Sequence, residues 1–541
     1  MRPLPANLHD PGRLRRGAAA AALTLLLAGC GGGGSSGASA ARPTPAPAPA
    51  PAPPPAPLGF ENGTFAASTQ FEDLCAVPRT TLDPNGRPWP DVQGTTVDEN
   101  DFLRSWSHEL YLWFDEIEDV DPASLDTPAY FDRMRTFETT PSGAPKDRFH
   151  FTQPTDEFLA FTQSGVTAGY GAEFVILSSS PPREVRVAFS EPGSPASLAG
   201  IVRGAEIVTV DGVDVRFATT QAEIDVLNAG LFRAEPGDSF TFGVVDRGAT
   251  ETREVTLTAQ QLTSTPVRNL RVHDTASGPV GYVLFNDHIA TAEDGLIDAV
   301  ELFLGAGVTD LVLDMRYNGG GRLAVAAELG YMIAGPTSAG QVFDELQFNS
   351  KHQVFNPVTG QVLTPLEFPS RTLGISRPSG QPLPSLDLER VYVLTGPGTC
   401  SASESVMNGL RGIGVEVVQI GERTCGKPYG FYPEDNCGTT YFSIQFRGIN
   451  AQGWGEYADG FAPGIEAGPA GVVPGCTVAD DFDRELGDPA EGRLAAALAY
   501  RETGACPVAV TTSTATAGFR RVEPGPPLVR PPWREGAWVQ P

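Results

Sequence analysis

Residues 391–427, VYVLTGPGTCSASESVMNGLRGIGVEVVQIGERTCGK, decide the fold. The apolar, β-branched run at 391–394 predicts a buried strand. A Gly-Pro-Gly breaker follows, and Ser401 then opens a helical pattern that ends at Gly412, before a second apolar strand at 415–420. A strand, a sharp turn and a serine at a helix start would hold a hydroxyl above a sheet, where the unsatisfied N–H groups of the first helical turn can stabilise an oxyanion.

Lys427 ends this stretch in a chain that carries almost all of its positive charge as arginine. Only three of the 38 basic residues are lysines. Arginine stays protonated at any working pH, whereas a buried lysine can lose its proton and act as a base. Its pKa would have to fall from about 10.4 to about 7, which burial among apolar groups can supply. Lys427 is therefore a candidate general base, and the alternative is a solvated cation in a Gly-rich loop.

The composition indicates an acidic globular protein. The 541 residues carry a formal net charge of −27, and 41% of them are hydrophobic. The length predicts three or four structural units with a sizeable core. The negative charge argues against nucleic-acid partners and against adhesion to anionic lipid through a basic face.

Residues 1–29 are typical of a bacterial lipoprotein signal peptide. Arg13, Arg15 and Arg16 precede an apolar stretch at 18–27, which is too short to span a bilayer. The sequence LAGC ending at Cys30 resembles a lipobox, which implies cleavage before Cys30 and lipidation of its thiol; an ordinary signal peptide is the alternative. Gly31 rather than aspartate follows Cys30, and by the same resemblance this implies that the lipid anchor lies in the outer membrane, facing the periplasm. Residues 30–58, rich in Gly and Ser and then in Ala and Pro, predict a tether.

Six further cysteines follow Cys30. In an oxidising compartment this even number predicts up to three disulfides, with 15 possible pairings. Cys425 and Cys437 flank a short loop beside Lys427 and are the favoured pair. The chain has no CxxC motif and no histidine close to a cysteine, so neither a metal site nor a cofactor is expected.

Residues 59–163 predict a small helical domain that carries no chemistry. One helix is expected from 100 to 113 and another over 128–137, and His108 is expected to pack within the first.

Residues 164–262 resemble a bacterial PDZ module. GYGAEF at 169–174 precedes a predicted strand, and PGSPA at 192–196 and GAEIV at 204–208 follow. The resemblance implies that a peptide C-terminus joins the sheet edge, beside a helix at 220–228, while loop N–H groups take its carboxylate. The alternative is an interdomain prop that binds no peptide. The implied peptide-binding residues are Tyr170, Gly171, Ala172, Glu173 and Phe174.

Residues 263–506 alternate between strand and helix patterns, which predicts a mainly parallel α/β core. Residues 340–388 predict an excursion with short antiparallel strands, and Asp488 and Pro489 predict the start of a terminal helix. Residues 507–541 form a Pro-rich tail. The predicted fold class is multidomain α/β, with an inserted β-rich PDZ-like domain and a small helical N-terminal domain. Other predicted elements are strands at 281–285, 310–315 and 441–446 and helices at 292–304 and 323–333.

The chain resembles the C-terminal processing (tail-specific) serine peptidases, a PDZ-containing family with a serine–lysine dyad. The matching motifs are LDMRYNGGG at 313–321, SASE at 401–404 and GERTCGK at 421–427. With the PDZ-like segment they cover about 165–465. The resemblance implies a lipid-anchored endopeptidase that captures proteins or peptides by their free C-termini and hydrolyses internal peptide bonds.

The resemblance also implies a role for each matching residue. Ser401 would be the nucleophile and Lys427 its general base, because a neutral lysine can take the serine proton and pass it to the leaving amine. Glu404 would orient the site. The backbone N–H groups of Gly320 and Ala402 would form the oxyanion hole.

Three departures from the family pattern affect this assignment. The spacing from Ser401 to Lys427 is one residue longer than usual, and Gly319 stands where the family often has proline. Phe431 replaces the family's helper glutamine. The residues that could substitute for it are Gln445, Glu434 and Ser443.

Alternatives remain open within the site and beyond it. Ser403 or Cys400 could be the nucleophile, and His288 could be the base. A different class of function is an inactive PDZ- and peptidase-like binding lipoprotein, and a third is a carrier of an apolar ligand on the same fold.

Overall fold

The computed structural model describes residues 59–140, 142–464, 471–507 and 537–538, and all of them belong to one compact unit. The predicted signal peptide (1–29), the tether (30–58) with Cys30, and most of the predicted tail (507–541) lie outside the described residues. Within the described ranges, every helix is too short or too polar to span a bilayer.

A seven-stranded sheet forms the centre of the part that carries the sequence motifs. β12 pairs antiparallel with β13, and the remaining neighbours are parallel, as the α/β pattern predicted. In sheet order the strands are β12 (Val267–His273), β13 (Val280–Phe285), β14 (Asp310–Asp314), β18 (Arg390–Thr395), β19 (Glu416–Gly421), β25 (Val472–Thr477) and β24 (Ala462–Gly464).

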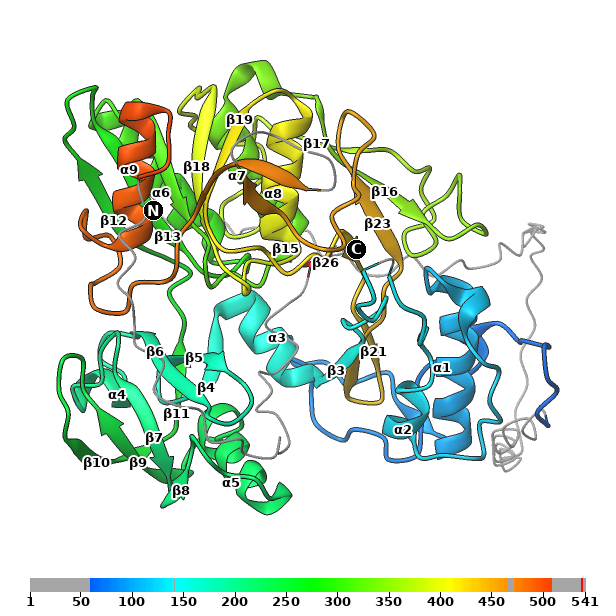
Figure 1. The fold of residues 1–541 in the computed structure, drawn as a ribbon. Coiled ribbons are helices and arrows are strands. Elements are labelled where there is room, and N and C mark those ends of the chain that lie inside the picture. Colours follow the sequence, from blue (N-terminus) through cyan, green and yellow to red (C-terminus); the bar gives the residue numbers. More distant parts are fainter. Residues whose placement is uncertain (1–58, 141, 465–470, 508–536, 539–541) are drawn as a thin grey trace, which may run out of the picture. The chain divides into compact units, whose positions relative to one another are not determined.

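Helices cover both faces of this sheet, because successive strand residues point to opposite faces. Val391 and Val393 pack with the helices α6, α7 and α8, whereas Tyr392 and Leu394 pack with α9. All four side chains are buried, which explains the uninterrupted apolar run. α7 and α8 lie side by side (Figure 1). The bounds are α6 (Ala292–Gly305), α7 (Leu323–Ala334), α8 (Ala402–Gly412) and α9 (Gly492–Thr503).

Smaller antiparallel sheets flank the central one. The excursion at 340–388 supplies β16 and β17, as predicted, and β3 joins β22 from far away in the sequence. The N-terminal region is thereby hydrogen-bonded to the segment that follows Lys427. The strands are β16 (Val342–Phe348), β17 (Leu366–Glu367), β20 (Tyr429–Gly430) and β23 (Phe446–Ile449), and, in the second sheet, β21 (Glu434–Asn436), β22 (Thr439–Phe442) and β3 (Phe151–Pro154).

The N-terminal part, residues 59–164, is mainly helical. The first long helix begins before its predicted start, because Thr95 and Asp98 form a capping box. Its Phe102 and Trp106 pack against Tyr130. The elements are α1 (Thr96–Leu110), α2 (Thr127–Phe131), α3 (Thr155–Ser164), the short strands β1 (Leu74–Cys75) and β2 (Val92–Gln93), and 3-10 turns at Ser68–Gln70 and Phe114–Glu116.

Residues 166–263, here named the inserted β-domain, form an antiparallel sheet in the order β10-β9-β7-β6-β5. β5 ends this order, so one of its edges has no strand partner among the described residues. β4 and β11 pair with each other where the chain enters and leaves. The elements are β4 (Val166–Gly169), β5 (Ala172–Ser178), β6 (Glu184–Ser190), α4 (Pro195–Leu198), β7 (Glu206–Val210), β8 (Val213–Asp214), α5 (Gln221–Phe232), β9 (Ser239–Val245), β10 (Thr252–Thr258) and β11 (Gln260–Thr263).

Three predicted elements are wrong in their extent. α9 begins at Gly492 rather than near Asp488, because the Glu491 side chain accepts the Leu494 N–H at 3.0 Å and caps the helix. The helix predicted over 128–137 ends at Phe131. The strand predicted at 441–446 is divided between β22 and β23, which belong to different sheets.

Three disulfides join Cys75 to Cys437, Cys400 to Cys425 and Cys476 to Cys506. The predicted Cys425–Cys437 pair is therefore wrong. Closeness in sequence was misleading, because the fold brings Cys400 and Cys425 to a Cα–Cα distance of 5.1 Å.

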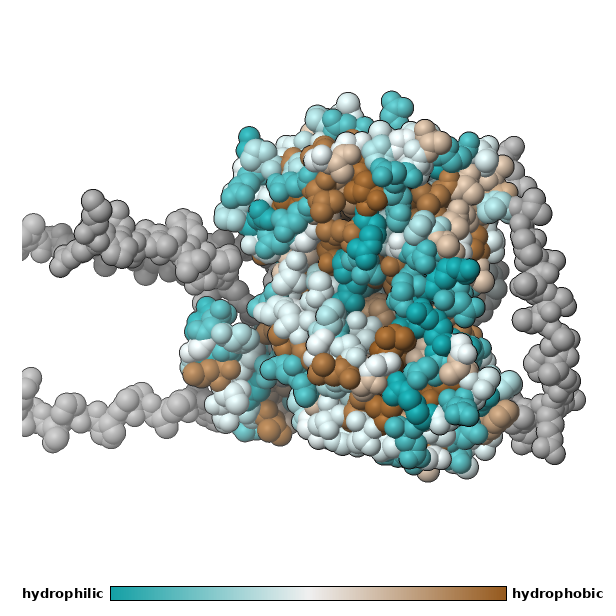
Figure 2. All heavy atoms as spheres, turned by 90° about the vertical axis from the view of Figure 1, so that its left-hand side faces the viewer, coloured by the Kyte–Doolittle hydropathy of each residue, from teal (hydrophilic) through white to brown (hydrophobic). Residues whose placement is uncertain are grey.

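On the face drawn in Figure 2, hydrophobic residues lie in small groups among polar ones.

Candidate active site

Ser401 occupies a strained turn between β18 and α8. Its backbone has φ of 62° and ψ of −115°, a conformation that costs a non-glycine residue about 1–3 kcal/mol. A strained strand-to-helix turn is also how α/β hydrolases present a nucleophilic serine. The side chain is fully buried, and its Oγ has no hydrogen-bond partner among the described residues. The turn therefore holds an unpaired hydroxyl at the start of a helix.

Asn318, in the loop after β14, supports this turn. Its backbone carbonyl accepts the Cys400 N–H at 3.0 Å and the Ser403 Oγ–H at 3.1 Å. Because the Ser403 hydroxyl is engaged in this bond, Ser401 is the better candidate for nucleophile. No role was predicted for Asn318, although an asparagine before three glycines in the loop after a buried strand was a usable signal.

Glu404 connects the Ser401 turn to the Lys427 loop. The buried carboxylate accepts the N–H groups of Ser401 (2.9 Å) and Lys427 (2.8 Å) on Oε2, and the Gly426 N–H (2.9 Å) and Thr424 hydroxyl (2.5 Å) on Oε1. Burial raises the pKa of Glu404, and these hydrogen bonds oppose that rise. Since one oxygen receives both N–H groups, Ser401 and Lys427 are neighbours in space although 26 positions separate them.

Lys427 is almost fully buried, with 1% of its surface exposed. Its Nζ lies 4.8 Å from the ring centroid of Phe149 and 4.3 Å from that of Phe431. It does not bond to Ser401, whose Oγ has no partner among the described residues. The predicted dyad residues are thus brought together, but the direct hydrogen bond between them is not formed in this structure.

The predicted oxyanion donors differ in availability. Ala402 is the first residue of α8, where a backbone N–H has no acceptor within the helix. The Gly320 N–H instead donates to Asn318 Oδ1 at 2.9 Å. In this structure the Gly320 N–H is thus engaged by the asparagine side chain, and its role as an oxyanion donor stays a prediction. Gly320 and Gly321, with φ of 105° and 136°, need the conformational freedom of glycine.

His288 lies beside the same glycine loop. Its backbone N–H donates to the Gly320 carbonyl and its Nδ1 is 3.0 Å from Asn318 Oδ1. Nε2 has no partner among the described residues, and complete burial lowers the pKa of His288 to about 3. The ring is therefore neutral at physiological pH, and the alternative in which it acts as base stays open.

Of the residues that could replace the helper glutamine, Gln445 is already engaged. Its amide bonds both the N–H and the carbonyl of Tyr432, each at 3.1 Å. Ser443 Oγ is buried without a partner among the described residues. Gln445 is thus unsuited to orient Lys427 in this structure, and Ser443 and Glu434 stay open as alternatives.

The Cys400–Cys425 disulfide lies directly at the site. Cys400 precedes Ser401, and Cys425 lies two residues before Lys427. Because both sulfurs are bonded, the alternative of Cys400 as a thiolate nucleophile is wrong in this state. Glu404 and these two sulfurs form the single cluster of possible metal ligands in the described ranges, and the disulfide leaves it without thiolates.

The predicted peptide-binding residues of the inserted β-domain lie at the start of its edge strand. The side chains of Tyr170, Glu173 and Phe174 are buried, and Phe174 faces Val187 of β6. The carbonyl of Gly171 accepts the Glu191 N–H at 2.7 Å. A ligand at this edge would therefore meet mainly backbone, not these three side chains.

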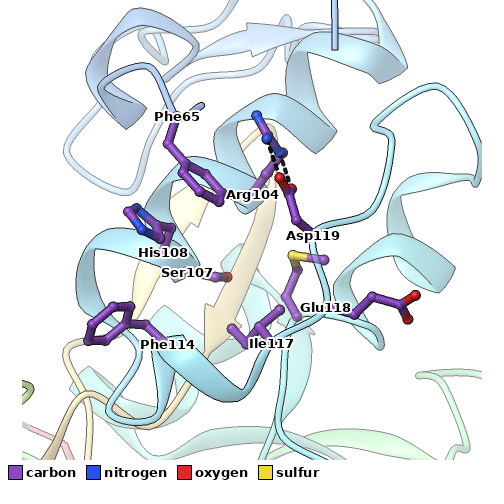
Figure 3. Close-up of a pocket in the computed structure, with 9 residues that line it drawn as sticks. Phe65, Arg104, Ser107, His108, Phe114, Ile117, Glu118 and Asp119 are labelled. Atoms are coloured by element: carbon purple, nitrogen blue, oxygen red, sulfur yellow. Dashed lines mark hydrogen bonds and ion pairs between the residues drawn. The ribbon is translucent and has the colours of Figure 1, made fainter. Parts of the chain in front are cut away.

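The cavity in Figure 3 lies in the N-terminal part and contains none of the predicted site residues. His108 stacks on Phe65 with a ring-centroid distance of 3.7 Å, in line with its predicted packing role. Arg104 and Asp119 form an ion pair at the cavity's edge, at 2.6 Å. This cavity is separate from the residues that surround Ser401.

Comparison with known proteins agrees with the motifs. The model of peptidase family S41 matches residues 279–430. The carboxyl-terminal-processing protease of a Picosynechococcus species is 26% identical over 271 residues, which are 50% of this chain and 56% of that protein. The chloroplastic carboxyl-terminal-processing peptidase 2 of Arabidopsis thaliana is 28% identical over 174 residues, 31% of this chain and 32% of that one.

A solved structure shares the fold. A crystal structure of an S41-type protease from Bacteroides fragilis has a TM-score of 0.55 at 22% identity, covering 77% of this chain and 98% of that one. The chain spans between one third and somewhat over half of the length of the two curated relatives. The matched region nevertheless holds the glycine loop, the Ser401 turn and Lys427. Residues 279–430 therefore match peptidase family S41, and the chain is similar to carboxyl-terminal-processing proteases over part of its length.

Proposed function

We propose that this protein is a serine endopeptidase in which Ser401 is the nucleophile. The observation that carries the proposal is the buried, unpaired Ser401 Oγ in a strained turn at a helix N-terminus. A hydroxyl without a partner inside a protein costs free energy, and strain of this kind gathers at functional sites. An amide substrate would give the hydroxyl a partner.

Lys427 is the proposed general base. Its near-complete burial beside two phenylalanine rings removes water from the amine, which favours the neutral form that a base requires. Before each attack, the amine would have to come within hydrogen-bond distance of the Ser401 hydroxyl. It would then accept the hydroxyl proton and deliver it to the leaving amine when the acyl-enzyme forms.

Glu404 is proposed as a positioning residue, since its carboxylate accepts the backbone N–H groups of Ser401 and Lys427 on the two sides of the site. The Ala402 N–H is the proposed first oxyanion donor. The Gly320 N–H could join it only after leaving Asn318 Oδ1, so substrate binding would have to rearrange the glycine loop.

The inserted β-domain is proposed to be a PDZ-like module for polypeptide C-termini. The open edge of β5, preceded by the loop at 169–171, supports this assignment, because a peptide can pair with such an edge while loop N–H groups bind its carboxylate. We also propose that Cys30 carries a lipid. This lipid would attach the protein to the outer membrane, facing the periplasm.

A non-catalytic binding lipoprotein is the second candidate. Phe431 in place of the helper glutamine and the absent Ser401–Lys427 hydrogen bond favour it. The test is cleavage of a tagged protein whose last residues are varied, by the wild-type chain and by Ser401→Ala. Cleavage that depends on those residues and is lost in Ser401→Ala supports the peptidase. Binding with no cleavage by either protein would leave only the second candidate.

A further inference from the structure

A second segment of the chain lies on the glycine loop. The two-residue strand β26 (Ala537–Trp538) pairs in parallel with β15 (Gly321–Arg322), so that Gly321 faces Ala537 and Arg322 faces Trp538 (Figure 1). β15 directly follows Gly320. More than 200 positions separate the paired strands, so this is a tertiary contact at the candidate active site.

The pairing uses the one side of β15 that the fold leaves open. On the other side, the Gly320 carbonyl accepts the His288 N–H at 3.0 Å and the Arg322 N–H donates to the His288 carbonyl at 2.8 Å. N–H and C=O groups of successive residues alternate in direction along a strand. Both polar groups of Gly321 therefore point away from His288, toward β26.

β26 also lies beside β20, which starts two residues after Lys427. The segment thus runs between the loop that carries Gly320 and the loop that carries Lys427. An extended chain between these loops would have its peptide groups close to the Ser401 turn. Proteins commonly bind peptides by adding them to such an unpaired strand edge.

We propose that the edge of β15 is the groove for the extended substrate backbone, and that Ala537–Trp538 of this same chain occupy it and compete with substrates. If the proposed peptidase function holds, occupation of the groove by this segment inhibits the enzyme. Whether the segment occupies the groove is a question of binding, which does not depend on catalysis. A tethered segment acts at a high effective concentration, so a weak strand pairing can block the groove.

The experiment separates occupancy from catalysis by using the full chain with Ser401→Ala throughout. One protein also carries Ala537→Pro and Trp538→Pro, because proline lacks the N–H that a strand needs. The matched control carries Ala515→Pro and Thr516→Pro. The probe is a fluorescent peptide with the sequence of residues 532–541, PWREGAWVQP, measured by fluorescence anisotropy.

We expect the 537/538 proline variant to bind the peptide at least about tenfold more tightly than the control, because its groove is vacated. Hydrogen exchange at the Gly321 amide gives a second readout and should accelerate in that variant alone. Equal affinity in both proteins, or no binding to either, would overturn the inference.

The same prolines in the active protein test the consequence. The KM for a protein substrate should fall several-fold while kcat stays the same. If no variant cleaves anything, the proposed peptidase function fails, whereas the peptide-binding result still decides the occupancy.

Discussion

Replacing Glu404 by glutamine is the most informative small perturbation of the site. Each carboxylate oxygen accepts two donors, and an amide can offer only one acceptor oxygen. The lower-energy orientation keeps that oxygen on the Ser401 and Lys427 N–H groups and turns the NH2 toward Thr424, whose hydroxyl can rotate and accept. Only the Gly426 N–H then loses its acceptor.

A buried donor without an acceptor costs about 1–3 kcal/mol. The free energy of unfolding of Glu404→Gln should therefore fall by roughly 1–3 kcal/mol, and that of Glu404→Ala, which leaves three N–H groups unpaired, by more. Movement of the Gly426–Lys427 backbone should lower kcat by at least about tenfold with little change in KM, because positioning errors of this size are costly in catalysis.

The assay is steady-state peptide cleavage together with urea unfolding followed by fluorescence. Glu416→Gln is the matched control, because that side chain is about half exposed on β19 and its ion pair with Arg390 is long, at 4.0 Å. The reasoning would be refuted if Glu404→Gln matched wild type within twofold in kcat and showed an unchanged unfolding free energy.

Three further predictions concern other parts of the fold. Replacing Cys400 and Cys425 together by alanine should cost about 2–4 kcal/mol of stability and lower kcat, since the disulfide links both sides of the site; unchanged kcat in the folded variant would contradict this. Burial raises the pKa of Glu328 from 4.5 to about 8, so the native state keeps a proton that the unfolded chain has lost and wild-type stability falls as pH rises through this window. Glu328→Gln should therefore match wild type near pH 4 and exceed it increasingly up to pH 8, by at most about 1.4 kcal/mol per pH unit, and a pH-independent difference in urea unfolding would disprove the assignment. Arg203→Ala should lower the free energy of unfolding by about 1.5–3 kcal/mol, because it removes one of the two guanidinium groups that contact the largely buried Asp480 carboxylate, at 2.6 Å, and leaves the other, Arg316, at 2.7 Å; melting equal to wild type would count against a structural role.

The central sheet could be predicted from the sequence because its strands are buried on both faces. Such strands appear in the sequence as continuous apolar runs. The observed bounds of β13 and β18 agree with the predicted bounds to within one residue. The start of α9 was predicted too early, because Asp488 and Pro489 carry the stronger local signal for a helix start. The residue that caps the helix is Glu491, which is an unusual residue type at this position.

The sequence was enough to predict which residues make up the candidate site, but not all of the contacts between them. The motifs identify Ser401, Glu404 and Lys427, and the fold brings these three together. Local sequence does not record that Cys400 pairs with Cys425, because this pairing depends on how two separate loops meet. The bond from the Gly320 N–H to Asn318 Oδ1 spans only two positions, so it is a local turn that an asparagine before glycines could have predicted.

The role of Lys427 as the group that activates Ser401 is tested most directly by kcat/KM for one peptide substrate. Lys427→Ala should lower kcat/KM by about 10²–10⁴-fold, the usual contribution of a general base, and His288→Gln should lower it much less. Lys351→Ala, which removes another of the three lysines, is the control and should match wild type. A Lys427→Ala protein that cleaves as fast as wild type, while His288→Gln is inactive, would contradict the account and transfer the role of base to the histidine.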